Sequence, residues 1–429
     1  MPSKETPGPQ TILVVGKWGE VEFVMLRQLF QFIRAPYLHS LIPEGRRAFP
    51  DRSQLNIEVV GFHSLSVGIG VSARLCAETL AGAGFNVNCR DVGKVFLKKP
   101  ELAWSWRSRI ADDRINCRIF HLTPSMLPRA VFSIGRRKFE STYNIGYWAW
   151  ETDLLPQESQ LAVRYIDAIL VPSRFTRDVF RKYTTKPVLL VPHPVAVGSV
   201  EKNIRDMLAI GPDDFLASFV FSFGSSFERK NPLAVVDAFN RAFAHVDNAH
   251  LVLKSSHGRQ YPYELARLQA AIGLSPRIRL IDDIWPTPRV MGLIAESNAF
   301  VSLHRCEGFG LPIAEAIALG VPVVATDWSG NTDFCDPDNT CLVPAGETTV
   351  DTFHPEFRAL EGARWAEPDI DQAARCLKAI FDDPKAAKKR AVRAKAFMER
   401  YLAKHTYPSA MDELQSAGST RYAQDRAEA

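Results

Sequence analysis

Two carboxylates, Glu307 and Glu315, stand on either side of a glycine-containing turn in the C-terminal half of the chain. The apolar run 299–303 before the turn predicts a buried strand, and 311–319 after it predicts a helix. A helix N-terminus favours an anion, whereas carboxylates repel phosphate and accept hydrogen bonds from hydroxyls. The arrangement therefore fits a phosphate-linked sugar. The alternative is a solvated glutamate beside a purely structural turn.

The elements around this turn form a strand–turn–helix–strand unit, because the apolar run 321–325 follows the helix. In open parallel sheets such turns lie at the carboxyl ends of the strands, where ligands bind. Glycine lets the backbone approach a ligand closely. We therefore expect the backbone from Gly308 through Phe309 and Gly310 to Leu311 to line a ligand site.

Two adjacent cations, Arg229 and Lys230, end the loop after the predicted strand 215–223. Arginine binds a diphosphate as a fork and lysine as a point charge. The alternative is a solvated basic pair at the start of the helix predicted from about 232 to 245. Because cations are unfavourable at a helix start, their presence there favours a ligand.

The N-terminal half offers a second glycine turn and an aromatic cluster. Gly68 and Gly70 lie between the predicted strand 57–62 and a helix over 71–83, as a second candidate phosphate cradle or a tight turn only. The predicted strand 117–122 carries His121 near its end. Trp148, Trp150 and Glu151 suit sugar recognition, and they equally suit a packed domain corner.

Glu307 and Glu315, seven residues apart around Gly-Phe-Gly-Leu-Pro, resemble the E-x7-E element of retaining, nucleotide-sugar-dependent glycosyltransferases with the GT-B fold. The resemblance is closest to the bacterial mannosyl- and glucosyltransferases of the large "glycosyl transferases group 1" family. Three further patterns carry it: Arg-Lys-Asn-Pro at 229–232, Val-Pro-His-Pro-Val at 191–195, and Gly-Tyr-Trp-Ala-Trp-Glu at 146–151.

The resemblance implies a role for each candidate residue. It makes Glu307, Arg229, Lys230 and His121 catalytic, with Glu307 on the sugar hydroxyls and the two cations on the leaving diphosphate. It places the donor at Gly308, Phe309, Gly310, Leu311, Glu315, Lys254 and Asp283, with Glu315 at the ribose, and the acceptor side of the cleft at Gly68, Gly70, Trp148, Trp150 and Glu151. It implies retention of the anomeric configuration without a general base. The loop 329–334 is expected to border the sugar pocket.

No obligatory metal or further cofactor is expected, because Asp282 and Asp283 do not look like the D-x-D metal motif of the other glycosyltransferase fold. GDP-sugars and UDP-sugars both stay open as donors. The acceptor is expected to be a saccharide or lipid-linked saccharide of surface polysaccharide or glycoconjugate assembly. A non-catalytic nucleotide-sugar binding protein and a GT-B epimerase are the alternatives, and a phosphorylase would need a pyridoxal site that is not evident.

Strand–helix alternation in both halves predicts the α/β class independently of any family. The resemblance specifies GT-B architecture, with two Rossmann-like parallel-sheet domains facing each other across a cleft. We expect an N-terminal extension over 1–53, an acceptor domain over 54–195, a nucleotide-sugar domain over 196–404, and a crossover and tail over 405–429, loose beyond about 416. The extension is expected to be partly disordered. Its amphipathic pattern over 23–33 predicts a helix that packs on its own domain or lies on a membrane surface.

Composition limits the remaining classes. A length of 429 residues allows two domains, and a net charge of +4 implies no nucleic-acid partner. Seven cysteines without a C-x-x-C pair predict reduced, mostly buried thiols and no structural zinc. No segment has the layout of a membrane span or a secretory signal. The sequence thus predicts a cytoplasmic protein, with peripheral contact to the inner face of the plasma membrane left open.

Overall fold

The computed structural model describes Tyr37 and residues 40–427 apart from 46, 108, 109, 196, 353, 358 and 359, with backbone only from 418 onwards. The chain divides into two units, residues 1–43 and residues 44–429, and both lobes described below belong to the second unit. The predictions for residues 1–36, including the amphipathic helix, lie outside the described residues.

The N-terminal lobe is built on a six-stranded sheet in the order β2-β1-β3-β4-β5-β6. Each neighbouring pair of strands is parallel. Every residue of the central strands β3 and β4 is buried, as expected for parallel strands covered on both faces. The elements of this lobe are β1 (Asn56–Gly61), α2 (Gly68–Gly82), β2 (Asn86–Asp91), β3 (Cys117–His121), α3 (Leu127–Ile134), α4 (Arg136–Glu140), β4 (Tyr143–Tyr147), α5 (Gln157–Val163), β5 (Ala168–Val171), α6 (Arg174–Arg181) and β6 (Val188–Leu190).

The C-terminal lobe carries a second six-stranded parallel sheet, in the order β12-β11-β10-β7-β8-β9. Buried phenylalanines of β7 and α9 contribute to its core. Its elements are α7 (Ile204–Met207), β7 (Phe215–Val220), α8 (Phe227–Lys230), α9 (Pro232–Ala242), β8 (Ala249–Ser255), α10 (Pro262–Ile272), β9 (Ile278–Asp282), α11 (Thr287–Ala295), β10 (Ala299–Ser302), α12 (Leu311–Ala318), β11 (Val323–Thr326), β12 (Cys341–Val343) and α13 (Ile370–Asp382). The predicted α/β architecture is confirmed.

The strand order locates the ligand-binding edge of each sheet. In the C-terminal lobe the chain builds outwards from β7 to β8 and β9, and then crosses to β10, β11 and β12. The direction reverses between β7 and β10, and ligands of open α/β sheets bind beyond the carboxyl ends of strands at such a point. The corresponding reversal in the N-terminal lobe lies between β1 and β3. Both predicted glycine turns follow strands at these two points.

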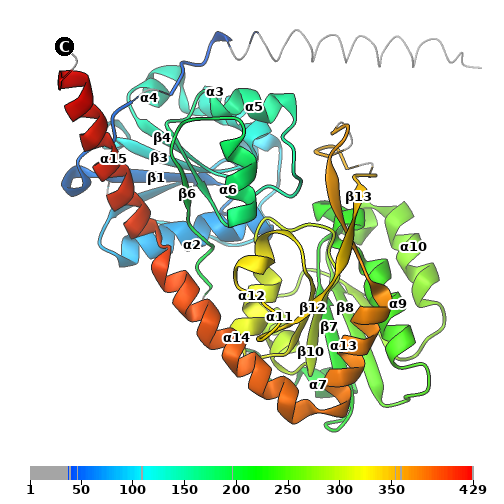
Figure 1. Ribbon diagram of the computed structural model, residues 1–429. Helices are drawn as coiled ribbons and strands as arrows, with labels where there is room; N and C mark the ends of the chain where they lie inside the picture. Colours follow the sequence, from blue (N-terminus) through cyan, green and yellow to red (C-terminus); the bar gives the residue numbers. More distant parts are fainter. Residues whose placement is uncertain are drawn as a thin grey trace, which may run out of the picture. The chain divides into compact units, whose positions relative to one another are not determined.

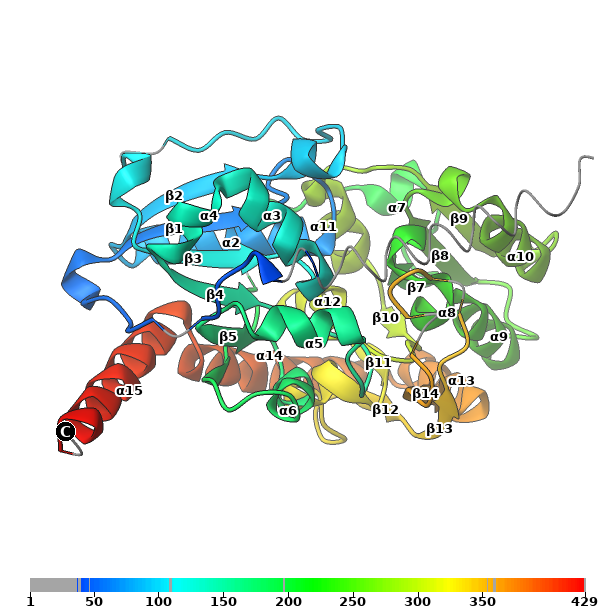
Figure 2. The ribbon, with the colours of Figure 1, turned by 90° about the horizontal axis from the view of Figure 1, so that it is seen from above.

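Two long helices at the C-terminus join the lobes (Figures 1 and 2). Helix α14 (Pro384–Lys404) packs Ala394 and Met398 into the core of the C-terminal lobe. Helix α15 (Tyr407–Ala427) buries Met411 and Leu414 against the N-terminal lobe and contacts α2. The prediction of a loose tail beyond about 416 was wrong, because α15 continues to Ala427 once its first turns are anchored on the N-terminal lobe.

A small antiparallel hairpin, which the sequence analysis did not predict, projects from the C-terminal lobe (Figure 1). Its strands are β13 (Ala345–Thr349) and β14 (Arg364–Pro368). At the start of β14, the Arg364 amide donates to Asp153 Oδ1 of the N-terminal lobe at 2.8 Å. No helix in the described part of the chain is long and apolar enough to cross a membrane.

Candidate functional site

A short helix, α8, positions the two predicted cations. Ser226 caps it with a φ of +69°, and the chain leaves it through Asn231 at a φ of +53°. Arg229 and Lys230 were predicted in a loop that leads into a helix. They lie instead in the last turn of α8, where the helix dipole favours cations. The location of these two cations is therefore explained without a ligand, and only their burial favours one.

Arg229 is buried, with 4% of its surface exposed. Its Nη1 donates to the Cys306 carbonyl at 2.9 Å and to Glu307 Oε2 at 3.1 Å, and its Nη2 donates to the Ser225 carbonyl at 2.8 Å. Lys230 Nζ pairs with Glu307 Oε1. Arg229 Nε, also buried, has no hydrogen-bond partner in the described part of the chain. The cluster thus retains one buried donor for a further acceptor.

The charges in this cluster are strongly coupled. Burial opposes ionisation of Glu307, but Lys230 and Arg229 outweigh it and lower the pKa of that carboxyl to about 2. Burial lowers the pKa of Lys230, partly offset by Glu307. Arg229 Nη2 also lies 3.8 Å from Glu151 Oε1 of the N-terminal lobe. The two cations therefore face two carboxylates, and any phosphate that binds here competes with them.

The turn after β10 is held by close backbone packing. The Glu307 amide donates to Ser329 Oγ and the Gly330 amide donates to the Glu307 carbonyl, both at 2.9 Å. A Cβ on Gly330 would lie 2.4 Å from the Gly308 carbonyl oxygen, so only glycine fits. Gly310, with a φ of +91°, leads into α12. Hydrogen bonds and close backbone packing thus hold the predicted glycine turn against the loop 329–334.

Helix α12 carries the second glutamate of the predicted pair. Glu315 is half-buried, and burial raises the pKa of its carboxyl to about 8. Its side chain makes no hydrogen bond to the described residues.

Phe309 packs its ring against Phe334 and His193 at centroid distances of 4.9 and 5.2 Å. The Phe309 side chain therefore serves packing, and its backbone remains the candidate contact together with Leu311, the first residue of α12.

Lys254 and Asp283 lie at the ends of β8 and β9. Lys254 Nζ donates to the Ser255 carbonyl at 2.6 Å and to the Asp283 carbonyl, and it lies 5.3 Å from the centroid of the Trp285 ring. Burial lowers the pKa of Lys254 to about 8. Asp283 is exposed, and its carboxylate accepts from the Ile284 amide at 2.8 Å. A nucleotide contact of either side chain stays a prediction.

His121 is buried at the carboxyl end of β3. Its Nδ1 lies 2.8 Å from Ser72 Oγ, and its ring stacks on Tyr147 at 4.4 Å. Burial lowers the pKa of His121 well below the usual range, so the ring is neutral at pH 7. Its Nε2 has no partner among the described residues. Nearby, a Cβ on Gly70 would lie 2.5 Å from the Phe62 carbonyl oxygen, whereas one on Gly68 would meet nothing within 4 Å.

The two predicted tryptophans pack inside the structure. Trp148 is fully buried against Phe180, at a centroid distance of 5.4 Å. Trp150 is 2% exposed, and its Nε1 donates to Thr152 Oγ1 at 2.8 Å and to the Leu154 carbonyl at 2.7 Å. These positions favour the packed-corner alternative over stacking on a sugar. Glu151 between them is the member of this motif that reaches Arg229.

Contacts between the lobes bring part of the predicted site together. Thr176 Oγ1 donates to the Gly308 carbonyl at 3.3 Å, and Arg174 pairs with Asp333 Oδ1 at 2.9 Å. Arg229, Lys230, Glu307 and Glu151 form one cluster beside the Gly308 turn, whereas Lys254 and Trp148 lie within their own lobes. Sequence reasoning missed Glu356, which lies near Glu151 and Arg229. No sequence motif indicates a role for Glu356, because its neighbours in space are distant in the chain.

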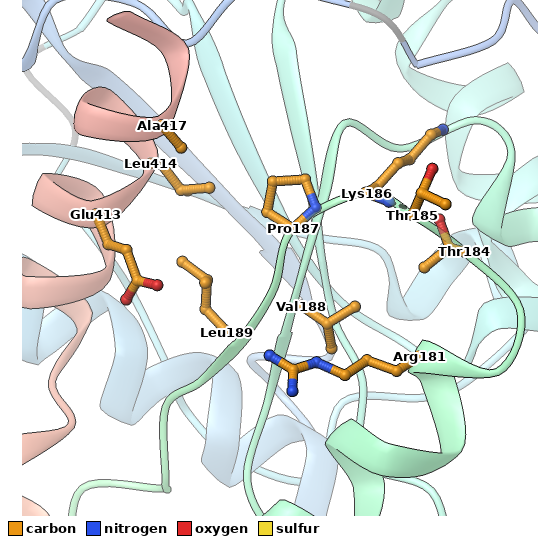
Figure 3. A pocket seen from close by; sticks show the side chains of 10 residues that line it. All are labelled: Arg181, Thr184, Thr185, Lys186, Pro187, Val188, Leu189, Glu413, Leu414 and Ala417. Atoms are coloured by element: carbon orange, nitrogen blue, oxygen red, sulfur yellow. Dashed lines mark hydrogen bonds between the residues drawn. The ribbon is translucent and has the colours of Figure 1, made fainter. Parts of the chain in front are cut away.

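A cavity of about 360 Å³ lies elsewhere, in the N-terminal lobe between β6 and α15 (Figure 3). Its lining includes Arg181, Lys186, Leu189 and Leu414, and none of the predicted site residues. In the described part of the chain, no group of three or more His, Cys, Asp or Glu side chains is arranged to hold a metal ion.

Residues 218–354 match the protein family described as "Glycosyl transferases group 1". No curated protein matches the chain. Many solved structures are similar in fold, and three of them follow. TarM from S. aureus, in a complex that contains UDP, has 12% identity and a TM-score of 0.50 over 72% of this chain and 56% of TarM, so the likeness spans about half of that protein.

HepE from Anabaena, solved in complex with UDP-glucose, has 13% identity and a TM-score of 0.58 over 86% of this chain and 100% of HepE. Sucrose-phosphate synthase from Thermosynechococcus elongatus has 14% identity and a TM-score of 0.56 over 87% and 100% of the two chains. At these identities the likeness shows the fold, which is GT-B. The family match adds that residues 218–354, in the C-terminal lobe, are similar to the glycosyl transferases group 1.

Proposed function

We propose that the protein transfers a hexose from a nucleoside-diphosphate sugar to a saccharide or lipid-linked saccharide, with retention of the anomeric configuration, in surface polysaccharide or glycoconjugate assembly. The observation that carries the donor part is the buried Arg229–Lys230–Glu307 cluster where the C-terminal sheet reverses direction. Two buried cations with an unpartnered arginine Nε provide what a diphosphate requires.

In this reaction the bond from C1 of the sugar to the diphosphate oxygen breaks, and a bond from C1 to the acceptor oxygen forms. The acceptor proton passes to the leaving phosphate. Arg229 and Lys230 stabilise the negative charge that grows on the leaving group, as preorganised charges in a site with little water. The backbone of the Gly308 turn and the start of α12 add the helix dipole. The donor is a GDP- or UDP-sugar, without an obligatory metal.

Thermal unfolding with UDP, GDP and their common sugar conjugates, in the absence of metal, tests the donor part. Binding to the native state raises the apparent Tm. We expect one nucleotide series to stabilise the wild type, and the Arg229→Ala variant to lose that stabilisation. Arg400→Ala, at an exposed position of α14, is the matched control and should behave as wild type. If no nucleotide shifts the wild-type Tm, the donor assignment is wrong.

A further inference from the structure

The loop between β13 and β14 brings the C-terminal lobe against the N-terminal lobe beside the Arg229 cluster. Near its start, Thr352 Oγ1 donates at 3.1 Å to Glu228 of α8, the residue before Arg229. Further along, Phe357 is 2% exposed and packs edge-on against Trp150 at a centroid distance of 5.7 Å. The described residues of this loop are therefore anchored both to α8 and to the aromatic corner of the other lobe.

Glu356 lies between these two anchors and is half-buried. The groups that face it are Glu151 and the Thr123 hydroxyl from the N-terminal lobe and Arg229 from the C-terminal lobe. The Thr123 hydroxyl lies near the Glu356 carboxyl group, and Thr123 follows β3 closely, two residues after His121. Residues from both lobes thus meet at one carboxylate.

The surroundings of Glu356 bring the pKa of its carboxyl group close to neutral pH. Burial, followed by the charge of Glu151, raises the pKa of Glu356 to about 7, while Thr123 and Arg229 oppose the rise. His354 of the same loop has its pKa lowered by burial first and then by Arg229. Two neighbouring carboxylates of this kind repel a phosphate but accept hydrogen bonds from hydroxyls.

The cluster therefore has two chemically different sides. On one side Arg229 and Lys230 meet Glu307, where the proposed diphosphate would bind. On the other side Arg229 meets Glu151, with Glu356 next to it. Resting on the proposed function, we propose that Glu151 and Glu356 form the acceptor site, where their carboxylates accept hydrogen bonds from the attacking sugar hydroxyl and orient it.

The two carboxylates are not consumed in this step. The acceptor oxygen bonds to C1, the C1–diphosphate bond breaks, and the hydroxyl proton passes to the leaving phosphate, so Glu151 and Glu356 act by positioning. Glu356 accepts best when ionised. Turnover should consequently decline as the pH falls through about 7, the pKa of Glu356 in the folded protein.

The test compares the wild type with Glu356→Gln, Glu151→Gln and the control Glu361→Gln, which changes an exposed glutamate of the same loop. The donor is whichever nucleotide sugar stabilises the wild type. Its affinity is measured by calorimetry. Turnover is measured against pH as sugar released to water, and as transfer to p-nitrophenyl α-glucoside and α-mannoside, which serve as model acceptors.

We expect Glu356→Gln to keep donor affinity within about twofold, to lose about tenfold in turnover, and to lose the decline near pH 7. In Glu151→Gln the decline should move to lower pH, because removal of a like charge lowers the pKa of Glu356. A profile that stays in place would show that Glu356, whose pKa the charge of Glu151 raises, is not the group that governs turnover. Glu361→Gln should match the wild type.

Unchanged turnover and an unchanged pH profile in Glu356→Gln would overturn the inference. Loss of donor binding in that variant would also overturn it, since Glu356 would then belong to the donor site. A wild type that binds donor but releases sugar neither to water nor to either glycoside would count against a hydroxyl site here. If Glu356→Gln does not fold, the profile of Glu151→Gln decides alone. A wild type that binds no nucleotide sugar refutes the proposed function itself, which separates the two failures.

Discussion

Replacing Glu307 with Gln separates its electrostatic role from its shape. The carboxyl has a pKa of about 2 in the folded protein against an ordinary 4.5. A difference of roughly 2.5 units, at about 1.4 kcal/mol per unit, corresponds to about 3 kcal/mol of stability at neutral pH. Because the folded pKa is depressed, this contribution is complete above pH 4.5 and is lost as the pH falls towards 2.

Urea unfolding measures this directly. Glu307→Gln should unfold about 3 kcal/mol more easily than the wild type at pH 7, because it leaves two buried cations without their carboxylate. The difference in unfolding free energy between the variant and the wild type should become smaller as the pH falls below 4.5. Glu399→Gln, at an exposed site on α14, controls for loss of one negative charge. An equal difference in unfolding free energy at pH 7 and at a pH of about 3 would refute the reasoning.

The same variant should bind nucleotide more tightly while it transfers sugar more slowly. A diphosphate competes with Glu307 for Arg229 and Lys230, and the glutamine competes less. The upper limit is about 3 kcal/mol, and solvent screening reduces the expected gain to about tenfold in Kd for UDP or GDP. Calorimetry with the nucleotide alone provides the measurement. Weaker binding than wild type would show that Glu307 holds the nucleotide instead of competing with it.

Two further substitutions test the turn and the helix beside this cluster. Gly330→Ala places a Cβ 2.4 Å from the Gly308 carbonyl oxygen, so it should lower the Tm and weaken nucleotide binding, and a variant with normal affinity would show that the turn tolerates displacement. Glu315→Gln removes a carboxyl whose pKa burial raises to about 8, so ionisation costs stability as the pH rises from 4.5 through 8. Its Tm relative to wild type should therefore be higher in alkaline buffer than in mild acid, and an unchanged difference would contradict the burial of the charged group.

The parallel sheets could be predicted from the sequence because each strand buries both faces. The apolar run 299–303 corresponds to β10 at Ala299–Ser302, and 117–122 corresponds to β3 at Cys117–His121. The β13–β14 hairpin could not be predicted in this way. Its first strand is largely exposed and polar, and it carries no apolar alternation that would reveal its partner.

The candidate site was predictable as a set of loops but not as a set of contacts. Glycine turns and adjacent cations mark the carboxyl ends of strands in the sequence itself. Whether Trp148 stacks on a sugar or on Phe180 depends on the packing of segments that are distant in the chain. The spacing of apolar residues in the sequence carries no information about that packing. The same holds for Glu356, whose neighbours Glu151 and Arg229 come from two other elements.

The sequence and the structure assign different partners to Glu307, and the two assignments can belong to successive states. The family resemblance implies that its carboxylate binds sugar hydroxyls, whereas the structure pairs it with Lys230 and Arg229. If the donor diphosphate takes over these cations, Glu307 loses its partners at the moment when the sugar arrives beside it. A carboxyl group released in this way has lost its cation partners, and its oxygens are available to accept hydrogen bonds from hydroxyls. Exchange of one anion for another would then couple donor binding to the formation of the sugar site.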